Sequence, residues 1–379
     1  MFILYPFPEA LPIEKARGVQ VVNITRALAD EACNVELIQT GNDISGIYRH
    51  YGITPSPRFV PTSISRSIGF GGFKLQSNKI FNFRLSRHID SLKNKPDLII
   101  SRHLKTAYHL LRHHKDIPLL YDAHEVFSES STNPKNIAAL EKMESFVLHH
   151  ASFVTAISES LREDLKLRYE FDKPVHIVRT ATAVPPDMPT KDYSGPGRHI
   201  IYTGSLYEWK GVEDIIEAGQ HLDETCHITV IGGNEEQIAV LKKRLGAHAV
   251  KFSFYPFMPH DRIQHYLQDA CIALLPNSPG SVSRWTSPLK LFEYLANGCA
   301  IIASDIPTIR ELLTENQACF YNSGDARALA GCINKLNENP QLAENLGRQG
   351  HELAQLHDWS HRARQILSIV SGNPTRETR

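Results

Sequence analysis

Residues 287–305, SPLKLFEYLANGCAIIASD, hold the residue types best suited to binding a phosphate. Ser287 and Pro288 are typical of a helix start, with proline at the first helical position. The free backbone amides of Leu289 and Lys290 would then point out from the positive end of the helix dipole, where an anion binds favourably. The ammonium of Lys290 adds a full charge beside those amides. The segment therefore predicts an anion site at a helix N-terminus.

Glu293 follows one turn further along the same predicted helix. A carboxylate can accept hydrogen bonds from both hydroxyls of a ribose, and a ribose attached to the bound phosphate could reach this side chain. The spacing is equally compatible with a solvated ion pair between Lys290 and Glu293 on a surface helix. Spacing alone therefore leaves a nucleotide site and a plain surface helix as alternatives.

A second candidate anion site lies in residues 202–218, YTGSLYEWKGVEDIIEA. A predicted strand runs through Gly204 and Ser205 into a turn, and Lys210 with Gly211 begins a helix. This order places an amine near a helix N-terminus, where a diphosphate could lie. Taken by itself, a Lys-Gly pair at a helix start is usually only part of a loop.

A third candidate site follows the apolar run in residues 118–127, PLLYDAHEVF. A buried strand would deliver Asp122, His124 and Glu125 at its carboxyl end. There the imidazole of His124 could donate a hydrogen bond to a substrate oxygen near neutral pH. A single histidine after a strand is, however, more often structural than functional.

Residues 16–30, ARGVQVVNITRALAD, form a fourth candidate segment. Gly18, preceded by Arg17, ends the loop after the first predicted strand, and a glycine there allows the backbone to approach a ligand closely. The three-glycine fingerprint of dinucleotide-binding folds is missing, so the segment does not indicate a nicotinamide cofactor.

Short apolar runs rich in β-branched and aromatic residues alternate with amphipathic helical patterns along the whole chain. Strands that are apolar on both faces are typical of parallel sheets covered by helices on both sides. We therefore expect two doubly wound α/β domains of the Rossmann-like kind. The predicted strands lie at 2–5, 34–40, 97–101, 118–122, 153–158, 175–180, 199–205, 226–233, 249–255, 271–276, 299–305 and 318–321.

The best candidate linker is residues 184–197, which carry four prolines and two glycines between strand-like runs. We place one domain at residues 1–185 and a second at residues 186–355. Residues 356–379 would form a helix that returns to the first domain, although such a helix could also pack on its own domain.

The length of 379 residues exceeds what one core usually organises, which favours two domains. The 41 basic and 41 acidic residues cancel, so the chain has no overall attraction for nucleic acid. Its six scattered cysteines lack the spacing of a metal site and indicate free thiols in a reducing compartment. No run approaches the roughly 20 apolar residues that span a bilayer, and early prolines argue against a secretory signal. A cytoplasmic protein is expected.

Residues 51–115 depart from this neutrality, because they carry twelve Lys or Arg against two Asp, a net charge of 12 − 2 = +10. With the apolar stretches 67–75 and 80–85, this segment could hold the protein against an anionic membrane surface. Alternatively, its charges form a solvated face and its apolar residues belong to the core.

Taken together and in this order, the four candidate segments resemble glycosyltransferase family 4, the retaining GT-B family also called glycosyl transferases group 1. The resemblance covers nearly the whole chain. It rests on TGSLYEWKGVEDIIEA, SPLKLFEYLANGCAIIASDIPTIREL, YDAHE and FVTAISESL. It implies a GT-B fold, in which two Rossmann-like domains face a central cleft and a C-terminal helix crosses back to the first domain.

The resemblance also implies roles for the matching residues. Lys210 would neutralise the diphosphate of a sugar donor, His124 would lie beside the reacting sugar, and the two would be the catalytic residues. Arg17 and Gly18 would line the cleft on the acceptor side. No cofactor and no metal are expected. The residues expected to bind the donor are Gly204, Ser205, Lys210, Ser287, Leu289, Lys290 and Glu293.

Three positions depart from the family pattern. Ser205 stands where the family usually has an arginine, so one charge facing the diphosphate is missing, and Lys290 or Arg284 is a candidate to replace it. Trp285 stands where a first glutamate is usual. Arg17 replaces one member of a glycine pair. These departures put the contacts to the donor sugar and the acceptor in question.

The function expected from the resemblance is transfer of a sugar, with retention of anomeric configuration, from a UDP- or GDP-linked donor to a hydroxyl of a glycan or lipid-linked acceptor. Cell-surface polysaccharide or glycolipid synthesis would be its setting, at the inner face of the membrane. Two alternatives stay open. A nucleotide-sugar epimerase has the same architecture, and a non-catalytic subunit would bind the sugar nucleotide without turnover.

Overall fold

The structure is a computed structural model, and it describes the chain except residues 71–72, 132, 194–198, 281–283, 286 and 373–379. The chain forms two compact units. Unit 1 comprises Met1–Arg179 and the residues from Trp359 onward, and unit 2 comprises Thr180–Asp358. The division after Arg179 comes before the predicted linker 184–197, the end of which lies outside the described residues.

Unit 1 is built on a seven-stranded sheet in the order β3-β2-β1-β6-β7-β8-β9, with every neighbouring pair parallel. The central strands are apolar and buried on both faces, as the continuous apolar runs predict. The strands are β1 (Phe2–Pro6), β2 (Asn34–Gln39), β3 (Phe59–Ser63), β6 (Leu98–Ser101), β7 (Leu119–Ala123), β8 (Phe153–Ala156) and β9 (Val175–Ile177).

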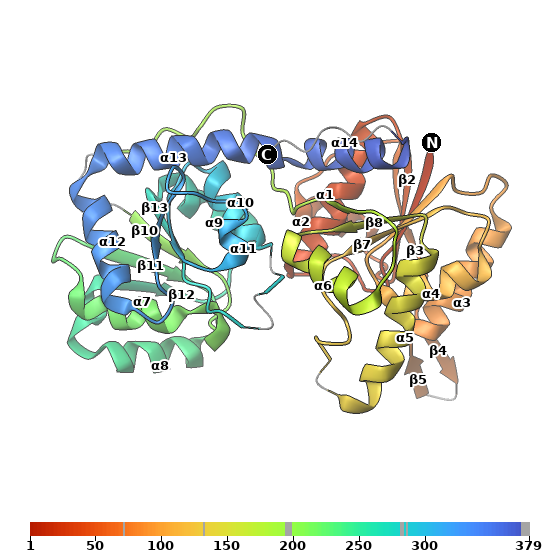
Figure 1. Cartoon of the computed structure of the whole chain (residues 1–379), viewed down its shortest axis with the longest axis horizontal. Coiled ribbons are helices and arrows are strands. Elements are labelled where there is room, and N and C mark those ends of the chain that lie inside the picture. Colours follow the sequence, from red (N-terminus) through yellow and green to blue (C-terminus); the bar gives the residue numbers. More distant parts are fainter. Residues whose placement is uncertain (71–72, 132, 194–198, 281–283, 286, 373–379) are drawn as a thin grey trace. The chain divides into compact units, whose positions relative to one another are not determined.

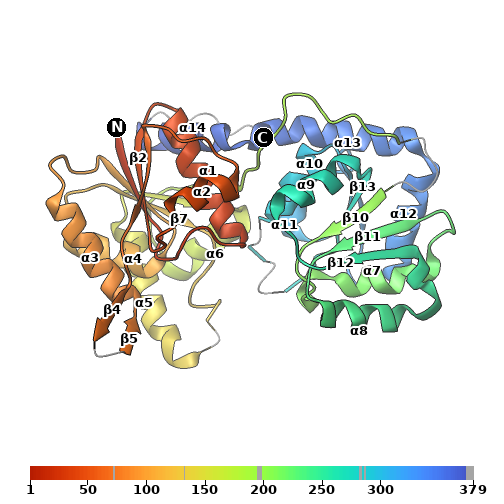
Figure 2. The same ribbon diagram turned by 180° about the vertical axis from the view of Figure 1, so that it is seen from behind.

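Helices pack on this sheet, and several begin at side chains that cap them. Asn133 caps α5 with Pro134 directly behind it, and the Ser158 hydroxyl accepts a hydrogen bond from the amide of Leu161 in α6. The last helix, α14, lies along α1 (Figures 1 and 2), so it belongs to unit 1. The helices are α1 (Ala16–Asp30), α2 (Ile44–Tyr51), α3 (Asn78–Ser91), α4 (Leu104–His113), α5 (Pro134–His150), α6 (Glu159–Tyr169) and α14 (Trp359–Val370).

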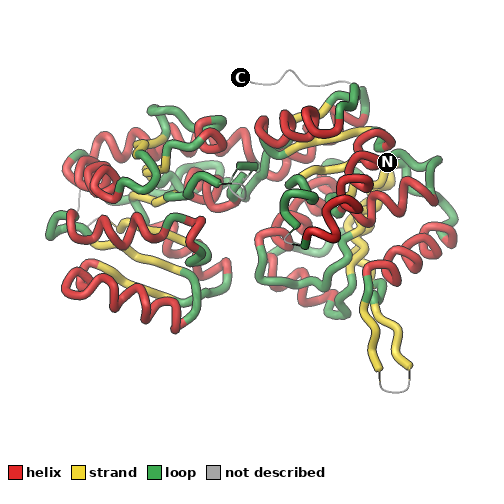
Figure 3. Tube along the Cα trace, turned by 60° about the horizontal axis from the view of Figure 1, so that its bottom comes forward, coloured by secondary structure: helices red, strands yellow, loops and turns green. Residues whose placement is uncertain are grey.

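An antiparallel hairpin, β4 (Ser67–Phe70) and β5 (Phe73–Gln76), is an element of unit 1 that the sequence pattern did not predict. It extends away from the rest of its unit (Figure 3), and residues 71–72 between its strands lie outside the described part of the chain. The apolar stretch 67–75 is therefore largely a projecting hairpin rather than core.

Unit 2 has a six-stranded parallel sheet in the order β12-β11-β10-β13-β14-β15. Alternate residues of β10 enter two different cores, Ile200 and Tyr202 on one face and Ile201 on the other. The strands are β10 (His199–Thr203), β11 (His227–Ile231), β12 (Phe252–Tyr255), β13 (Ile272–Leu275), β14 (Ala300–Ser304) and β15 (Ala318–Tyr321).

Helices close both faces of the unit 2 sheet. Side chains of α7, α8 and α12 share one core with the strands, and side chains of α9, α10 and α11 share the other. The α-helices are α7 (Val212–Ala218), α8 (Glu235–Leu245), α9 (His260–Asp269), α10 (Leu289–Ala296), α11 (Pro307–Arg310), α12 (Ala326–Glu338) and α13 (Pro340–Ala354). Short 3₁₀ helices are η1 (Glu208–Lys210), η2 (Gly219–His221), η3 (Gly246–Lys251) and η4 (Gln355–His357).

Each sheet reverses its strand order once, between β1 and β6 in unit 1 and between β10 and β13 in unit 2. In doubly wound sheets the ligand binds at the carboxyl ends of the strands next to this reversal. The predicted fold of two Rossmann-like domains is confirmed. Within the described residues, no helix combines the length and apolarity that crossing a bilayer requires.

Candidate functional site

The carboxyl end of β10, beside the strand reversal of unit 2, brings together several predicted donor-binding residues. The Nζ atom of Lys290 donates a hydrogen bond to the carbonyl oxygen of Thr203 at 3.3 Å. The same atom lies 4.2 Å from the centre of the Tyr202 ring. Gly204 follows with a φ of +139°, and a Cβ added to it would lie 3.2 Å from Lys290 Nζ. The glycine thus leaves the approach to the ammonium open.

Lys210 and Lys290 form a pair of partly buried cations, which we call the lysine pair. Burial lowers the pKa of Lys210 to about 8. Burial, and then the charge of Lys210, holds the pKa of Lys290 well below its ordinary value. Two desolvated ammonium groups that repel each other are stabilised by an anion placed between them. The lysine pair is therefore suited to a ligand with at least two negative charges.

The segment after β13 packs against the turn that carries Lys210. The amide of Ser278 donates to the carbonyl oxygen of Trp209 at 3.2 Å, and a Cβ added to Gly211 would clash with the carbonyl of Pro276. Gly211 also has a φ of +69°, so a glycine is required there on two grounds. The Lys-Gly pair at the helix start is thus fixed against the neighbouring strand end.

The start of α10 differs from the predicted one by one residue. Pro288, with a φ of −71°, is the residue before the helix, so Leu289 rather than proline occupies the first helical position. Ser287 does not cap the helix; its buried Oγ finds no hydrogen-bond partner in the described part of the chain. The helix-start prediction for Pro288 is wrong by this one residue, and α10 begins without a side-chain cap.

Glu293 is buried in α10, and its carboxylate is partly engaged. His260, at the start of α9, lies 2.7 Å from Oε1 through its Nε2 atom. Asn297 links the two helices by donating to the carbonyl of Glu293 and to the side chain of Gln264. One carboxylate oxygen is therefore already bonded, and sequence spacing gave no sign of His260 because it lies on another helix.

Two residues that depart from the family pattern, Ser205 and Trp285, lie near this site in sequence, as does Arg284, a candidate for the missing charge. Ser205 contributes its carbonyl oxygen to a hydrogen bond from the Tyr202 hydroxyl at 2.9 Å. Trp285 is buried at 4% exposure. The backbone amide of Arg284 bonds to Gly280. The second lysine of the pair, Lys290, is the cation that lies next to Gly204.

In unit 1, the carboxyl end of β7 carries a buried polar cluster around Asp122. One carboxylate oxygen accepts from the Thr155 hydroxyl at 2.8 Å, and the other contacts Arg362 of α14 at 2.8 Å and His124 at 3.0 Å. Burial alone would raise the pKa of Asp122, but Arg362 and His124 hold it well below its ordinary value. Asp122 is therefore ionised and can only accept hydrogen bonds.

His124 is held in one protonation state by its surroundings. Burial, and then the charge of Arg102, lowers the pKa of His124 to about 4, against the opposing effect of Asp122. The neutral ring must carry its proton on Nε2, because that atom faces an acceptor carboxylate. Its Nδ1 atom can then accept a hydrogen bond from a hydroxyl, whereas the sequence had suggested a donor.

Arg17 and Gly18 open helix α1. Arg17 forms an ion pair with Glu9 at 2.5 Å. A Cβ added to Gly18 would clash with the Tyr51 hydroxyl and lie 2.7 Å from Ile13 Cγ1. Internal packing alone therefore accounts for this glycine, and the predicted cleft role of both residues stays a prediction.

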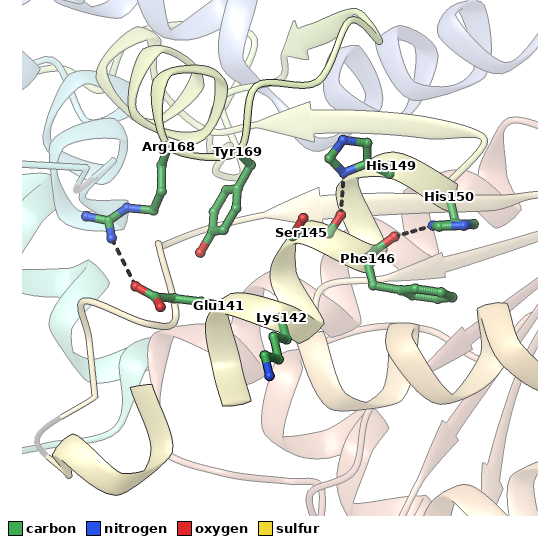
Figure 4. A pocket seen from close by; sticks show the side chains of 8 residues that line it. All are labelled: Glu141, Lys142, Ser145, Phe146, His149, His150, Arg168 and Tyr169. Carbon is green, nitrogen blue, oxygen red and sulfur yellow. Dashed lines mark hydrogen bonds and ion pairs between the residues drawn. The ribbon is translucent and has the colours of Figure 1, made fainter. Parts of the chain in front are cut away.

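A surface pocket of about 860 Å³ lies between α5 and α6 of unit 1 and is drawn in Figure 4. Tyr169 on its wall donates to the buried Glu144 at 2.6 Å, and Glu144 accepts from the amide of Phe127 at 2.7 Å and from that of Ser128 at 3.3 Å. The pocket wall is thus connected to the backbone that follows His124. The pocket is lined by Glu141, Lys142, Ser145, Phe146, His149, His150, Arg168 and Tyr169.

The basic segment 51–115 is not a single face of free charges. Arg102 donates to Gln20 at 2.8 Å, and burial lowers its pKa. Lys95 bonds to the carbonyls of Ile89 and Asp90. Part of the +10 charge is therefore used inside unit 1. As for metals, no group of three or more His, Cys, Asp or Glu placed to hold an ion occurs among the described residues.

Solved structures with the same architecture cover nearly the whole chain. Sucrose-phosphate synthase from Thermosynechococcus elongatus matches with a TM-score of 0.76 and 16% identity over 98% of both chains. Anabaena HepE in complex with UDP-glucose matches with a TM-score of 0.70 and 14% identity over 98% of this chain and 100% of its own. S. aureus TarM matches with a TM-score of 0.75 and 9% identity over 97% of this chain and 99% of its own. The two Rossmann-like units therefore have the GT-B fold.

Family models match each unit separately. The model of glycosyl transferases group 1 matches residues 192–353, and that of Glycosyltransferase Family 4 matches residues 18–182. No curated protein sequence matches the chain significantly. The chain belongs to the GT-B glycosyltransferases of the family 4 kind, as its motifs suggested.

Proposed function

We propose that the protein is a retaining glycosyltransferase, which moves a sugar from a nucleotide diphosphate to a hydroxyl of a glycan or lipid-linked acceptor. The lysine pair in unit 2 is the observation that carries this proposal. A nucleoside diphosphate offers the two or more negative charges that two partly buried ammonium groups need. Glu293, which follows Lys290 by one helical turn, is the candidate partner of the ribose.

The lysine pair would do more than bind. Cleavage of the bond from the anomeric carbon to the diphosphate builds negative charge on the leaving group. Preorganised ammonium groups stabilise that charge more in the transition state than in the ground state, which raises the rate. The leaving phosphate would then help to deprotonate the acceptor hydroxyl on the same face of the sugar, so that configuration is retained. His124, through Nδ1, would accept a hydrogen bond from a sugar hydroxyl. This scheme assigns no step to a metal.

UDP-sugars are the donors to test first. HepE has been solved with UDP-glucose, and TarM with UDP, and both have the fold of this chain. A thermal-shift screen of UDP- and GDP-sugars would identify the donor, because a ligand that binds only the folded state raises Tm. Release of nucleoside diphosphate in equal amount to the glycosylated product would exclude an epimerase. Donor hydrolysis on long incubation would argue against a non-catalytic subunit.

The decisive variants are Lys210→Met and Lys290→Met, which keep the length of the side chain and remove its charge. We expect each to lower kcat/KM for the donor by about 10²- to 10³-fold, the usual effect of removing one group that stabilises a leaving oxyanion. Lys243→Met is the matched control, since Lys243 is an exposed lysine of α8 in the same unit. Unchanged turnover in both site variants would contradict the proposal.

For the acceptor side, we propose that the hairpin β4–β5 brings unit 1 to an anionic membrane. Three side chains on and near the hairpin, Ile68, Leu75 and Phe83, are 49%, 66% and 60% exposed. Exposed Lys79 and Arg87 follow on α3. Apolar side chains beside basic ones are the combination that binds the surface of an anionic leaflet.

Co-sedimentation with vesicles tests this membrane contact. The wild type should bind vesicles that contain anionic lipid and bind neutral vesicles less, and the Ile68→Asp, Leu75→Asp variant should lose most of this binding. Val240→Asp is the control, because Val240 is similarly exposed at 59% but lies on α8 of unit 2. Equal binding of the hairpin variant and the wild type would refute the role of the hairpin.

A further inference from the structure

Two cysteines of unit 2 lie in contact with each other. They come later in the sequence than both residues of the lysine pair. Cys319 is in β15 and Cys332 is in α12, and their Sγ atoms are 2.7 Å apart. Both are free thiols and only partly buried, whereas Cys33, Cys226, Cys271 and Cys299 are buried.

The environment of Cys319 favours reaction. The hydrogen bond with Cys332 lowers the pKa of Cys319 to about 7, and the charge of Lys335 acts in the same direction. The thiolate is the reactive form, so Cys319 is the more reactive thiol of the two. By contrast, burial raises the pKa of the Cys33 and Cys299 thiols, which keeps them protonated.

Small molecules can reach Cys319. It lines a pocket of about 450 Å³ together with Lys335, Arg310 and Phe320. The guanidinium of Arg310 stacks on the Phe320 ring at 3.5 Å and is paired with Asp305 and Glu315, so its charge is balanced. Lys335 is the cation of this pocket wall that acts on Cys319.

We propose that Cys319 and Cys332 are a thiol modification site, which a low-molecular-weight disulfide such as oxidised glutathione converts into an intramolecular disulfide. Cys319 as thiolate attacks one sulfur of the oxidant, forms a mixed disulfide and releases one glutathione thiolate. Cys332 then loses its proton to solvent, attacks the Cys319 sulfur and releases the second glutathione. Two protein thiols are oxidised, and one glutathione disulfide is reduced to two thiols.

The step requires little movement, because a disulfide needs its sulfurs about 2.05 Å apart and these already touch. The bond would join β15 to α12, through two cysteines that are 13 residues apart in the sequence. Closing a loop restricts the unfolded chain, so oxidation should stabilise unit 2. We therefore expect oxidation to raise the Tm by several degrees, and dithiothreitol to reverse this rise.

The test is to incubate the full chain with oxidised glutathione, alkylate the remaining thiols, and map the cysteines by mass spectrometry after digestion. We expect a peptide that joins Cys319 to Cys332 and a loss of two free thiols per chain, without dimers. The Cys332→Ser variant should stop at the mixed disulfide and carry one glutathione on Cys319. Cys33→Ser should behave like the wild type.

Three results would overturn the proposal: equal alkylation of all six cysteines after oxidation, disulfides between chains only, or no glutathione on Cys319 in Cys332→Ser. Phenylarsine oxide, which binds two adjacent thiols, supplies a measurement on the wild type alone. It should protect Cys319 and Cys332 from alkylation, and their full alkylation in its presence would count against the pair. None of these readouts depends on glycosyltransferase activity.

Discussion

At the scale of single residues, the lysine pair destabilises the free protein, and a bound anion would offset this effect. A buried ammonium without a bonded carboxylate is destabilised, and two of them repel. Glu293 cannot fully compensate, because one of its oxygens is held by His260. In the free protein both lysines therefore lose their protons more easily, which is why the pKa values of Lys210 and Lys290 are lowered.

Binding of a diphosphate should reverse this effect and take up protons. The pKa of Lys210 is about 8 in the free protein, and a nearby anion raises it. We therefore expect proton uptake on binding UDP at pH 8, and an affinity that falls as the pH rises above about 8. Calorimetric titration in two buffers of different ionisation enthalpy measures the number of protons.

The same titrations with variants identify the groups responsible. Lys210→Met and Lys290→Met should each reduce the proton uptake, while Lys243→Met should leave it as in the wild type. Identical heats in the two buffers for the wild-type protein would show that the lysine pair does not meet the diphosphate.

The residues of this site differ in how far the sequence could indicate them. Lys210, Lys290 and Glu293 follow strand and helix starts whose positions the local pattern indicates. His260 and Arg362 are different, because their partners Glu293 and Asp122 lie on other elements, and the register between elements is set by packing rather than by local spacing. For this reason, the prediction that both oxygens of Glu293 bind a ribose did not foresee the hydrogen bond to His260.

At the scale of elements, helix α14 is tied to unit 1 by one buried guanidinium. Arg362 pairs with Asp122 at 2.8 Å, with both side chains at most 5% exposed, and it also bonds to the carbonyls of Val178 and Arg179. The same helix carries Arg364, whose pair with Glu31 is exposed. One helix thus offers a buried and an exposed ion pair for comparison.

Arg362→Met should lower the free energy of unfolding of unit 1 by about 3–5 kcal/mol, because it leaves Asp122 buried without its main partner. Arg364→Met should cost at most about 1 kcal/mol, as exposed pairs usually do. Urea denaturation followed by far-UV circular dichroism measures both. Equal losses in the two variants would mean that the pair with Asp122 contributes nothing special.

The pattern of the chain predicted most strands and helices, since buried parallel strands are continuous apolar runs. It did not predict the hairpin β4–β5, because Ser67–Phe70 and Phe73–Gln76 pair with each other and not with the sheet. Strand β3 was not predicted either, since Phe59–Ser63 contains a proline and lies at the sheet edge. Edge elements bury little, so their sequences are weakly constrained.

At the scale of the whole molecule, three histidines make unit 1 sensitive to acid. Burial lowers the pKa of His103, His109 and His124 to about 4 each. The unfolded chain binds protons at these residues near their usual pKa of about 6.5, so it takes up more protons than the folded protein between pH 6.5 and 4. Stability therefore falls as the pH is lowered through this window.

We expect the Tm of unit 1 to decrease between pH 6.5 and 4, and the His109→Gln variant to decrease less steeply. Glutamine removes the titrating group and keeps a polar atom near Ser86, which lies 2.9 Å from His109 Nε2. His248→Gln, an exposed position in unit 2, is the control. Differential scanning calorimetry at several pH values gives the slopes, and parallel slopes for His109→Gln and the wild type would disprove the assignment.

The chain enters unit 2 after Arg179 and leaves it at Asp358, so unit 2 is an uninterrupted insertion in unit 1. During synthesis the ribosome therefore delivers every residue of the second unit before the last helix of the first. Unit 2 can complete its fold while unit 1 still lacks Arg362, and Asp122 stays without this partner until helix α14 has left the exit tunnel. The half made first is thus the half that matures last.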